Sequence, residues 1–175
     1  HINIPNSWTS ISNDAFNQCS DLTSLSFESG SILETIGDRA FIEAPIKSNV
    51  TIPKSVKSIG TQAFYGCTAM TSTMLFETGS VLESLGSYAF ERTMVRNVTI
   101  PNSLLKIDIY TFVHCSSLTS LSFESGSILK EISANAFLGT AVKSVEIPAS
   151  VEIIGTDAFK LCPSLTSLSF ESGSI

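Results

Sequence analysis

The sequence predicts a solenoid, a coil of short repeated units with a parallel β-sheet along one face. Three observations support this prediction: a phenylalanine recurs every 22 to 26 residues, each cysteine holds the same place in the repeat, and alternating apolar residues precede each new unit. The recurring phenylalanines, each following Ala or Thr, are Phe16, Phe41, Phe64, Phe90, Phe112, Phe137 and Phe159.

Two kinds of unit alternate along the chain. One opens with Ile-Pro and ends with Phe-x-x-Cys, as in residues 52–67, whereas the other opens with Phe-Glu-Ser-Gly-Ser, as in residues 27–31. We therefore expect a single domain over residues 1–175. It would have about seven coils of 22–26 residues in two alternating types, and a partial coil at residues 168–175.

Each unit contains one run of strand-like alternation. Residues 22–27, 95–100 and 142–147 end in an apolar-polar-apolar pattern, after which Pro or Glu-Ser-Gly follows. This pattern predicts one short strand in each coil, with the apolar side chains facing inward. Because every connection returns in the same sense, the strands of successive coils should form a parallel sheet.

The segment after each strand has a different spacing. Val56, Ile59, Ala63 and Phe64 are separated by three or four residues and then by one. Such spacing predicts short helical or 3₁₀ turns on the face opposite the sheet. Stacking of coils about 4.8 Å apart would place the recurring phenylalanines in one continuous column, the main element of the core.

The four cysteines share one repeat position in every second coil: Cys19, Cys67, Cys115 and Cys162. Neighbours in that column should be about 9–10 Å apart, whereas a disulfide needs Cα atoms within about 7 Å. The intervening coils have Ala44, Thr93 and Thr140 at the same position. The pattern favours buried free thiols over disulfides, and it lacks the Cys-x-x-Cys or Cys/His spacing of a metal site.

The composition and the absence of known motifs narrow the range of functions that the chain can have. The net charge is −6, and no run of Lys and Arg exists to bind nucleic acid or an anionic membrane. No apolar stretch is long enough to span a membrane, and the first residues carry no secretory signal pattern. We find no nucleophile elbow, phosphate loop or paired-carboxylate motif, so we expect no enzyme, no cofactor and no metal.

Charged residues also follow the repeat. One column, at the ends of alternate strands, consists of Glu28, Glu77, Glu124 and Glu171; another, at the starts of the other strands, consists of Lys47, Arg96 and Lys143. We interpret both as solvated rims, with a weak row of divalent-cation sites along the glutamates as the alternative. His114 occupies a variable surface position beside Cys115, and we expect the two side chains to point apart.

The outward positions of the strands form the candidate binding face. Most are small hydrogen-bonding residues with little charge, a surface suited to broad protein contact: Asn49, Thr51, Thr73, Leu75, Asn97, Thr99, Ser120, Ser122, Ser144 and Glu146. A flat hydroxyl array for ice or carbohydrate is disfavoured because the residue types are irregular. One extra residue separates Cys67 from Phe76, which indicates either a bulge that turns Leu75 outward or a local rearrangement of the core.

Two segments match the N-glycosylation sequon. Asn49-Val-Thr51 and Asn97-Val-Thr99 are the same repeat position in different coils, so they count as one observation. The candidate acceptors are Asn49 and Asn97. Both would lie on the strand face, where a glycan would cover the surface.

Residues 52–70 follow the repeat Ile-Pro-x-x-Val-x-x-Ile-Gly-x-x-Ala-Phe-x-x-Cys-x-x-Leu as far as its cysteine, Cys67. This repeat resembles the leucine-rich repeat of the BspA-like (Treponema pallidum-type) surface protein family. The resemblance covers the whole chain. It implies a right-handed leucine-rich-repeat superhelix of the α/β type. The departures are Thr111 for Ala, Asp108 and Ser133 for Gly, and Trp8 at the position of Val56; none of them should prevent the fold.

The resemblance also implies a cell-surface or extracellular location and a non-catalytic role. Members of the family are adhesins or antigens that recognise host matrix proteins such as fibronectin and fibrinogen, host cells or other microbes. No binding motif of the family maps onto particular residues here, so only the strand face carries over. The alternative is a structural spacer or surface antigen segment with no ligand of its own.

Neither end of the sequence shows a polar capping repeat. We therefore expect the chain to be a slice of a longer protein. Uncapped ends would favour end-to-end self-association or exchange of the last strand.

Overall fold

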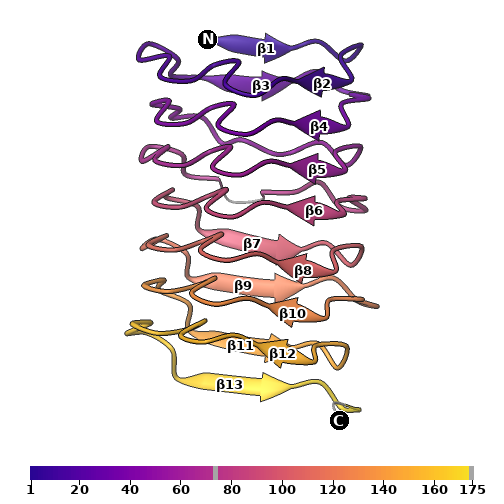
Figure 1. The fold of residues 1–175 in the computed structure, drawn as a ribbon, viewed down its shortest axis with the longest axis vertical. Helices are drawn as coiled ribbons and strands as arrows, with labels where there is room; N and C mark the ends of the chain where they lie inside the picture. The colour runs from indigo at the N-terminus through magenta and orange to yellow at the C-terminus, as the bar shows by residue number, and fades with distance from the viewer. Residues whose placement is uncertain (73–74, 174–175) are drawn as a thin grey trace.

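The computed structural model describes residues 1–72 and 75–173, which form a flattened stack of coils (Figure 1). Strands line two faces and run in opposite directions on them, while turns close both edges. This architecture confirms the predicted solenoid. The prediction of helical or 3₁₀ turns is wrong, since no helix occurs among the described residues.

The first face consists of longer strands, one in most coils. They are β1 (Ile2–Ile4), β3 (Leu25–Phe27), β7 (Asn97–Ile100), β9 (Ser120–Phe123), β11 (Ser144–Ile147) and β13 (Ser167–Phe170). Hydrogen-bonded ladders join them in parallel pairs, β1–β3, β7–β9 and β11–β13. Each pair links an Ile-Pro unit to the Phe-Glu unit that follows, and among the described residues between β3 and β7 the pairing is an isolated bridge from Ile52 to Phe76.

The second face consists of two-residue strands. They are β2 (Ser10–Ile11), β4 (Thr35–Ile36), β5 (Ser58–Ile59), β6 (Ser84–Leu85), β8 (Lys106–Ile107), β10 (Glu131–Ile132) and β12 (Ile153–Ile154). They form a four-stranded sheet, β2-β4-β5-β6, and a three-stranded sheet, β8-β10-β12.

Tight turns explain why the apolar residues have helix-like spacings of three and four although no helix forms among the described residues. After Ile59 the chain makes a run of turns in which Gln62 and Gly66 have positive φ angles of 57° and 68°. Equivalent residues, two before and two after each phenylalanine, have positive φ in every coil. The N–H of Phe64 donates to the carbonyl of Ala89 in the next coil (2.8 Å). Apolar spacings of three and four therefore arise from a short strand and these turns.

The column of phenylalanines forms as expected. Neighbouring rings are stacked from Phe16 to Phe159, with centroids 5.1–5.5 Å apart and interplanar angles of 2–12°. Phe41, Phe64 and Phe90 in the middle of the array have no exposed surface. These distances lie in the favourable range for aromatic pairs, so each ring supports the coils on either side.

Glycine controls how closely the coils approach on the second face. A Cβ atom added to Gly86 would lie 2.6 Å from backbone atoms of Gly60 and Thr61. In the next coil Asp108 takes the place of glycine, and no ladder joins β6 to β8 there. Ser133 also replaces glycine, but its N–H still donates to the carbonyl of Ile107 (3.0 Å).

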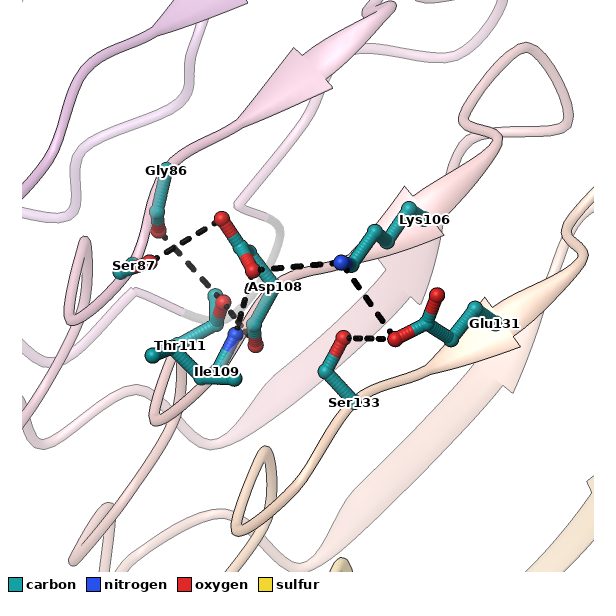
Figure 2. A network of polar contacts seen from close by, with 8 residues as sticks. All are labelled: Gly86, Ser87, Lys106, Asp108, Ile109, Thr111, Glu131 and Ser133. Carbon is teal, nitrogen blue, oxygen red and sulfur yellow. Dashed lines mark hydrogen bonds and ion pairs between the residues drawn. The ribbon is translucent and has the colours of Figure 1, made fainter. Parts of the chain in front are cut away.

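A polar network surrounds Asp108 at this interruption (Figure 2). Its carboxylate accepts hydrogen bonds from the Ser87 hydroxyl (3.0 Å) and from the backbone N–H of Ile109 (2.8 Å). Lys106 Nζ lies 3.7 Å from Asp108 and 3.3 Å from Glu131. The carboxylate that disrupts the ladder thus has hydrogen-bond partners, and the stack of coils continues past it.

All four cysteines are free thiols, but the predicted burial holds only in the middle of the stack, because the coils at its two ends have a neighbour on one side only. Cys67 and Cys115 are buried, and their Sγ atoms donate to the carbonyls of Phe41 (3.1 Å) and Phe90 (3.0 Å). Burial raises the pKa of each of these thiols to about 12. Cys19 is exposed and Cys162 is half-buried.

We expect these environments to separate the cysteines by reactivity. At pH 8 a disulfide reagent should modify Cys19 rapidly and Cys162 more slowly, whereas Cys67 and Cys115 should react only in denaturant, because their thiolates are disfavoured. Peptide mapping by mass spectrometry after timed labelling would follow each site. Rapid labelling of Cys67 in the native protein, or fewer than four thiols in denaturant, would contradict this assignment.

Candidate functional site

We use the name outer strand face for six exposed residues on β7, β9 and β11: Asn97, Thr99, Ser120, Ser122, Ser144 and Glu146. The register pairs Asn97 with Ser120 and Thr99 with Ser122, and the Thr99 and Ser122 hydroxyls are hydrogen-bonded at 3.0 Å. The alternate residues of these strands, such as Val98, are buried. The structure therefore brings these six predicted residues onto one surface.

The predicted residues Asn49 and Thr51 lie outside regular strands. In this part of the first face, serine hydroxyls replace ladder bonds. Ser48 Oγ accepts from the N–H of Leu25 and donates to its carbonyl (both 3.1 Å), and Ser72 Oγ makes the same pair of bonds to Val50 (3.1 and 2.7 Å). Asn49 and Asn97 are both exposed, and their glycosylation stays a prediction.

Leu75 is not a contact residue. Its side chain has no exposed surface, and its carbonyl accepts a hydrogen bond from the N–H of Ile52 (2.7 Å). Of the two possibilities raised by the extra residue, the rearranged core is the one found, because burying a leucine is more favourable than exposing it. Thr73, also predicted on this face, lies outside the described residues.

The second face has a different electrostatic character. Ion pairs join neighbouring coils there, between Lys57 and Glu34 (2.9 Å) and between Lys130 and Glu152 (2.6 Å). Such exposed pairs add little stability, but they show that this face is charged and that several of its charges are paired across coils. The outer strand face, by contrast, carries one charged side chain, that of Glu146, among its six residues.

The glutamate column is more than a solvated rim. Each carboxylate accepts a hydrogen bond from the N–H of the residue after proline in the preceding Ile-Pro unit, at 2.9–3.2 Å; the pairs are Glu28–Asn6, Glu77–Lys54, Glu124–Asn102 and Glu171–Ala149. Pro and Glu alternate at one repeat position, as at Pro53 and Glu77. This alternation of Pro and Glu is the feature of the sequence that could have predicted the hydrogen bonds between neighbouring units.

A hollow opens where the glutamate column meets the first face. It has a volume of about 330 Å³ and lies over the short turn at Pro53, between the longer turns that begin at Glu28 and Glu77. We call this hollow the Pro53 notch. Its lining includes Ser26, Phe27, Asn49, Thr51, Lys54 and the two glutamates. It therefore adjoins the predicted face residues Asn49 and Thr51.

The edge opposite the glutamate column carries a carboxyl group with a shifted pKa, that of Glu91. Glu91 is nearly buried, and burial raises its pKa, although the nearby charges of Arg92 and His114 oppose the shift. His114 is exposed while Cys115 is buried, so the two side chains do point apart. Within residues 1–72 and 75–173, no group of three or more His, Cys, Asp and Glu side chains is placed to hold a metal ion.

The stack of parallel strands on a column of apolar residues defines the class of protein: a repeat solenoid of the leucine-rich type. The BspA type leucine-rich repeat region matches the chain in six copies, over residues 1–83 and 83–174. The chain belongs to this family. In the part of the chain that the structure describes, no helix has the length and apolar character needed to cross a membrane.

Two solved structures are similar to this chain. The pneumococcal vaccine antigen PcpA is 29% identical with a TM-score of 0.73, over 85% of this chain and 37% of PcpA. A leucine-rich cell surface protein from Faecalibacterium prausnitzii is 20% identical with a TM-score of 0.55, over 98% of this chain and 48% of that protein. This chain thus spans less than half the length of either. No curated protein matches the sequence significantly.

Family membership indicates a protein-interaction or surface module. Leucine-rich repeats of this kind are typically non-enzymatic.

Proposed function

We propose that this chain is a non-catalytic recognition module of a cell-surface protein, and that it binds a protein partner through the outer strand face. The observation that carries the proposal is the contrast between the two faces. The first face presents hydroxyl and amide groups in register, as at Thr99 and Ser122, whereas the second face presents ion pairs between neighbouring coils.

The physical argument concerns desolvation. A partner that covers the second face must dehydrate paired charges, which is costly unless each is matched again. Hydroxyl groups on a rigid sheet lose less on dehydration and can donate or accept, so they suit contact over a broad, shallow area. The similarity to a pneumococcal vaccine antigen and to a bacterial cell surface protein supports an extracellular setting.

The partners to test first follow from the family resemblance: host matrix proteins such as fibronectin and fibrinogen, and host cells. Surface plasmon resonance on immobilised matrix proteins should detect binding by the wild-type chain. The double variant Asn97→Arg with Ser122→Arg should weaken it by at least about tenfold, because two buried unpaired charges each cost more than 1 kcal/mol.

A matched control adds the same two charges to the opposite face. The variant Ser10→Arg with Ser84→Arg changes exposed residues of β2 and β6 and should bind like wild type. Binding that survives the first double variant would exclude the outer strand face. If the wild-type chain binds no matrix protein or cell, the alternative of a structural spacer or antigen segment is favoured.

A further inference from the structure

One coil interrupts the polar pattern of the second face. The residue just before each short strand is polar or charged in the other coils: Thr9, Glu34, Lys57, Glu83, Lys130 and Glu152. In the coil of β8 this residue is Leu105, which is 54% exposed. Ile109, four residues later in the same coil, is also exposed. The β8 coil therefore presents apolar side chains where its neighbours present charges.

Two further aliphatic residues lie beside Leu105. Val81 and Ile128 are exposed and belong to the coils on either side of the β8 coil, so they are about 10 Å apart along the stack. Between them Ser103 is half-buried, and its hydroxyl donates to the carbonyl of Leu82 (2.8 Å). We call Val81, Leu105, Ile109 and Ile128 the Leu105 patch. A group of exposed apolar side chains on a charged surface is typical of a protein contact.

The order of the charges around the patch indicates what covers it. Along the stack the residues before the short strands are Glu34, Lys57, Glu83, Leu105, Lys130 and Glu152. If this series is reversed about Leu105, each charge next to the patch meets its opposite. Glu83 then corresponds to Lys130, and Lys57 corresponds to Glu152. The column is therefore complementary to a reversed copy of itself.

We infer that the second face binds a second copy of this chain, in a symmetric dimer centred on the Leu105 patch. Its two-fold axis runs parallel to β8, through the β8 coil, so it reverses the order of the coils and keeps each position along the strands opposite itself. Leu105 and Ile109 then pack against the same residues of the second copy, and Val81 packs against Ile128. A contact of this kind closes at two chains.

The cost of desolvation favours this occupant. Covering the ion pairs Lys57–Glu34 and Lys130–Glu152 is costly unless the charges are matched again. A second copy supplies an opposite charge to Lys57, Glu83, Lys130 and Glu152, and these four charges sum to zero. The net charge of −6 on each chain is therefore not concentrated in the contact.

Lys106 meets its own counterpart at the axis. Its Nζ lies 3.7 Å from Asp108 and 3.3 Å from Glu131, so its charge is balanced within each copy (Figure 2). The outer strand face lies on the other side of the stack and stays free in the dimer (Figure 1). The inference thus goes beyond the proposed recognition function, and it does not depend on which partner that face binds.

Sedimentation velocity on the whole chain tests the dimer. Because the patch is small, the association should be weak, and the average mass should rise from that of one chain towards that of two between about 10 µM and 1 mM. Leu105→Lys should weaken the dimer at least about tenfold, because it places like charges against each other at the axis. The variant should fold, since Lys57 and Lys130 hold the same position in other coils.

The matched control is Ser120→Lys, which adds the same charge to the outer strand face and should dimerise like wild type. Glu83→Lys and Lys130→Glu should each weaken the dimer, and their combination should restore it, because opposite charges face each other again. A chain that stays monomeric at about 1 mM, or a Leu105→Lys variant that dimerises like wild type, would overturn the inference. A mass that rises beyond two chains would overturn it in favour of end-to-end association.

Discussion

Phe64→Ala is expected to lower the free energy of unfolding by about 3–5 kcal/mol, because it empties a fully buried site in the middle of the aromatic column. The ring of Phe64 is stacked on Phe41 at 5.1 Å and on Phe90 at 5.2 Å, so one substitution removes two aromatic contacts as well as apolar burial. Urea denaturation followed by circular dichroism would measure the loss.

The same substitution at the end of the column is the control. Phe159 is only partly buried and is stacked on one neighbour, Phe137, at 5.3 Å, so Phe159→Ala should cost clearly less. Because each coil of a solenoid contacts only its neighbours, Phe64→Ala should also uncouple the two halves and broaden the transition. Equal losses at the two positions would show that the column is not the main support of the core.

Gly60→Ala should be the next most damaging change, with an expected loss of about 1–3 kcal/mol from overpacking. The added Cβ would lie 2.4 Å from Asp38 Oδ1 and 2.5 Å from the backbone nitrogen of Asp38. Since backbone atoms cannot move aside as a side-chain end can, the β4–β5 ladder must open. Thermal unfolding would report the loss in stability, and hydrogen exchange at Gly60, whose N–H donates to Ile36 (2.8 Å), would report the ladder.

The control for this prediction is a coil that already carries a Cβ. Ser133→Gly, at the equivalent position, should change stability by no more than about 1 kcal/mol, the usual backbone cost of glycine. If Gly60→Ala proves as mild, the close approach of coils on the second face is not what selects glycine. The interruption between β6 and β8 at Asp108 would then need another cause.

The candidate site was predictable in part. The outward positions of β7, β9 and β11 follow from strict alternation, and the structure exposes all six predicted residues there. Leu75 was misplaced because strict alternation exposes one of two neighbouring residues, whereas Leu75 and Phe76 are both buried, and only the packing of neighbouring coils decides this.

By itself the sequence determined the coil, the aromatic column, the free thiols and the outward residues of the strands, because each depends on a periodic spacing that any stacking of coils must preserve. Only the tertiary structure decided the second row of strands in place of helical turns, the serine bonds that replace ladder bonds near Val50, and the pairing of each glutamate with the coil before it. These features depend on hydrogen bonds between residues more than twenty positions apart, whose geometry is set by how closely neighbouring coils approach.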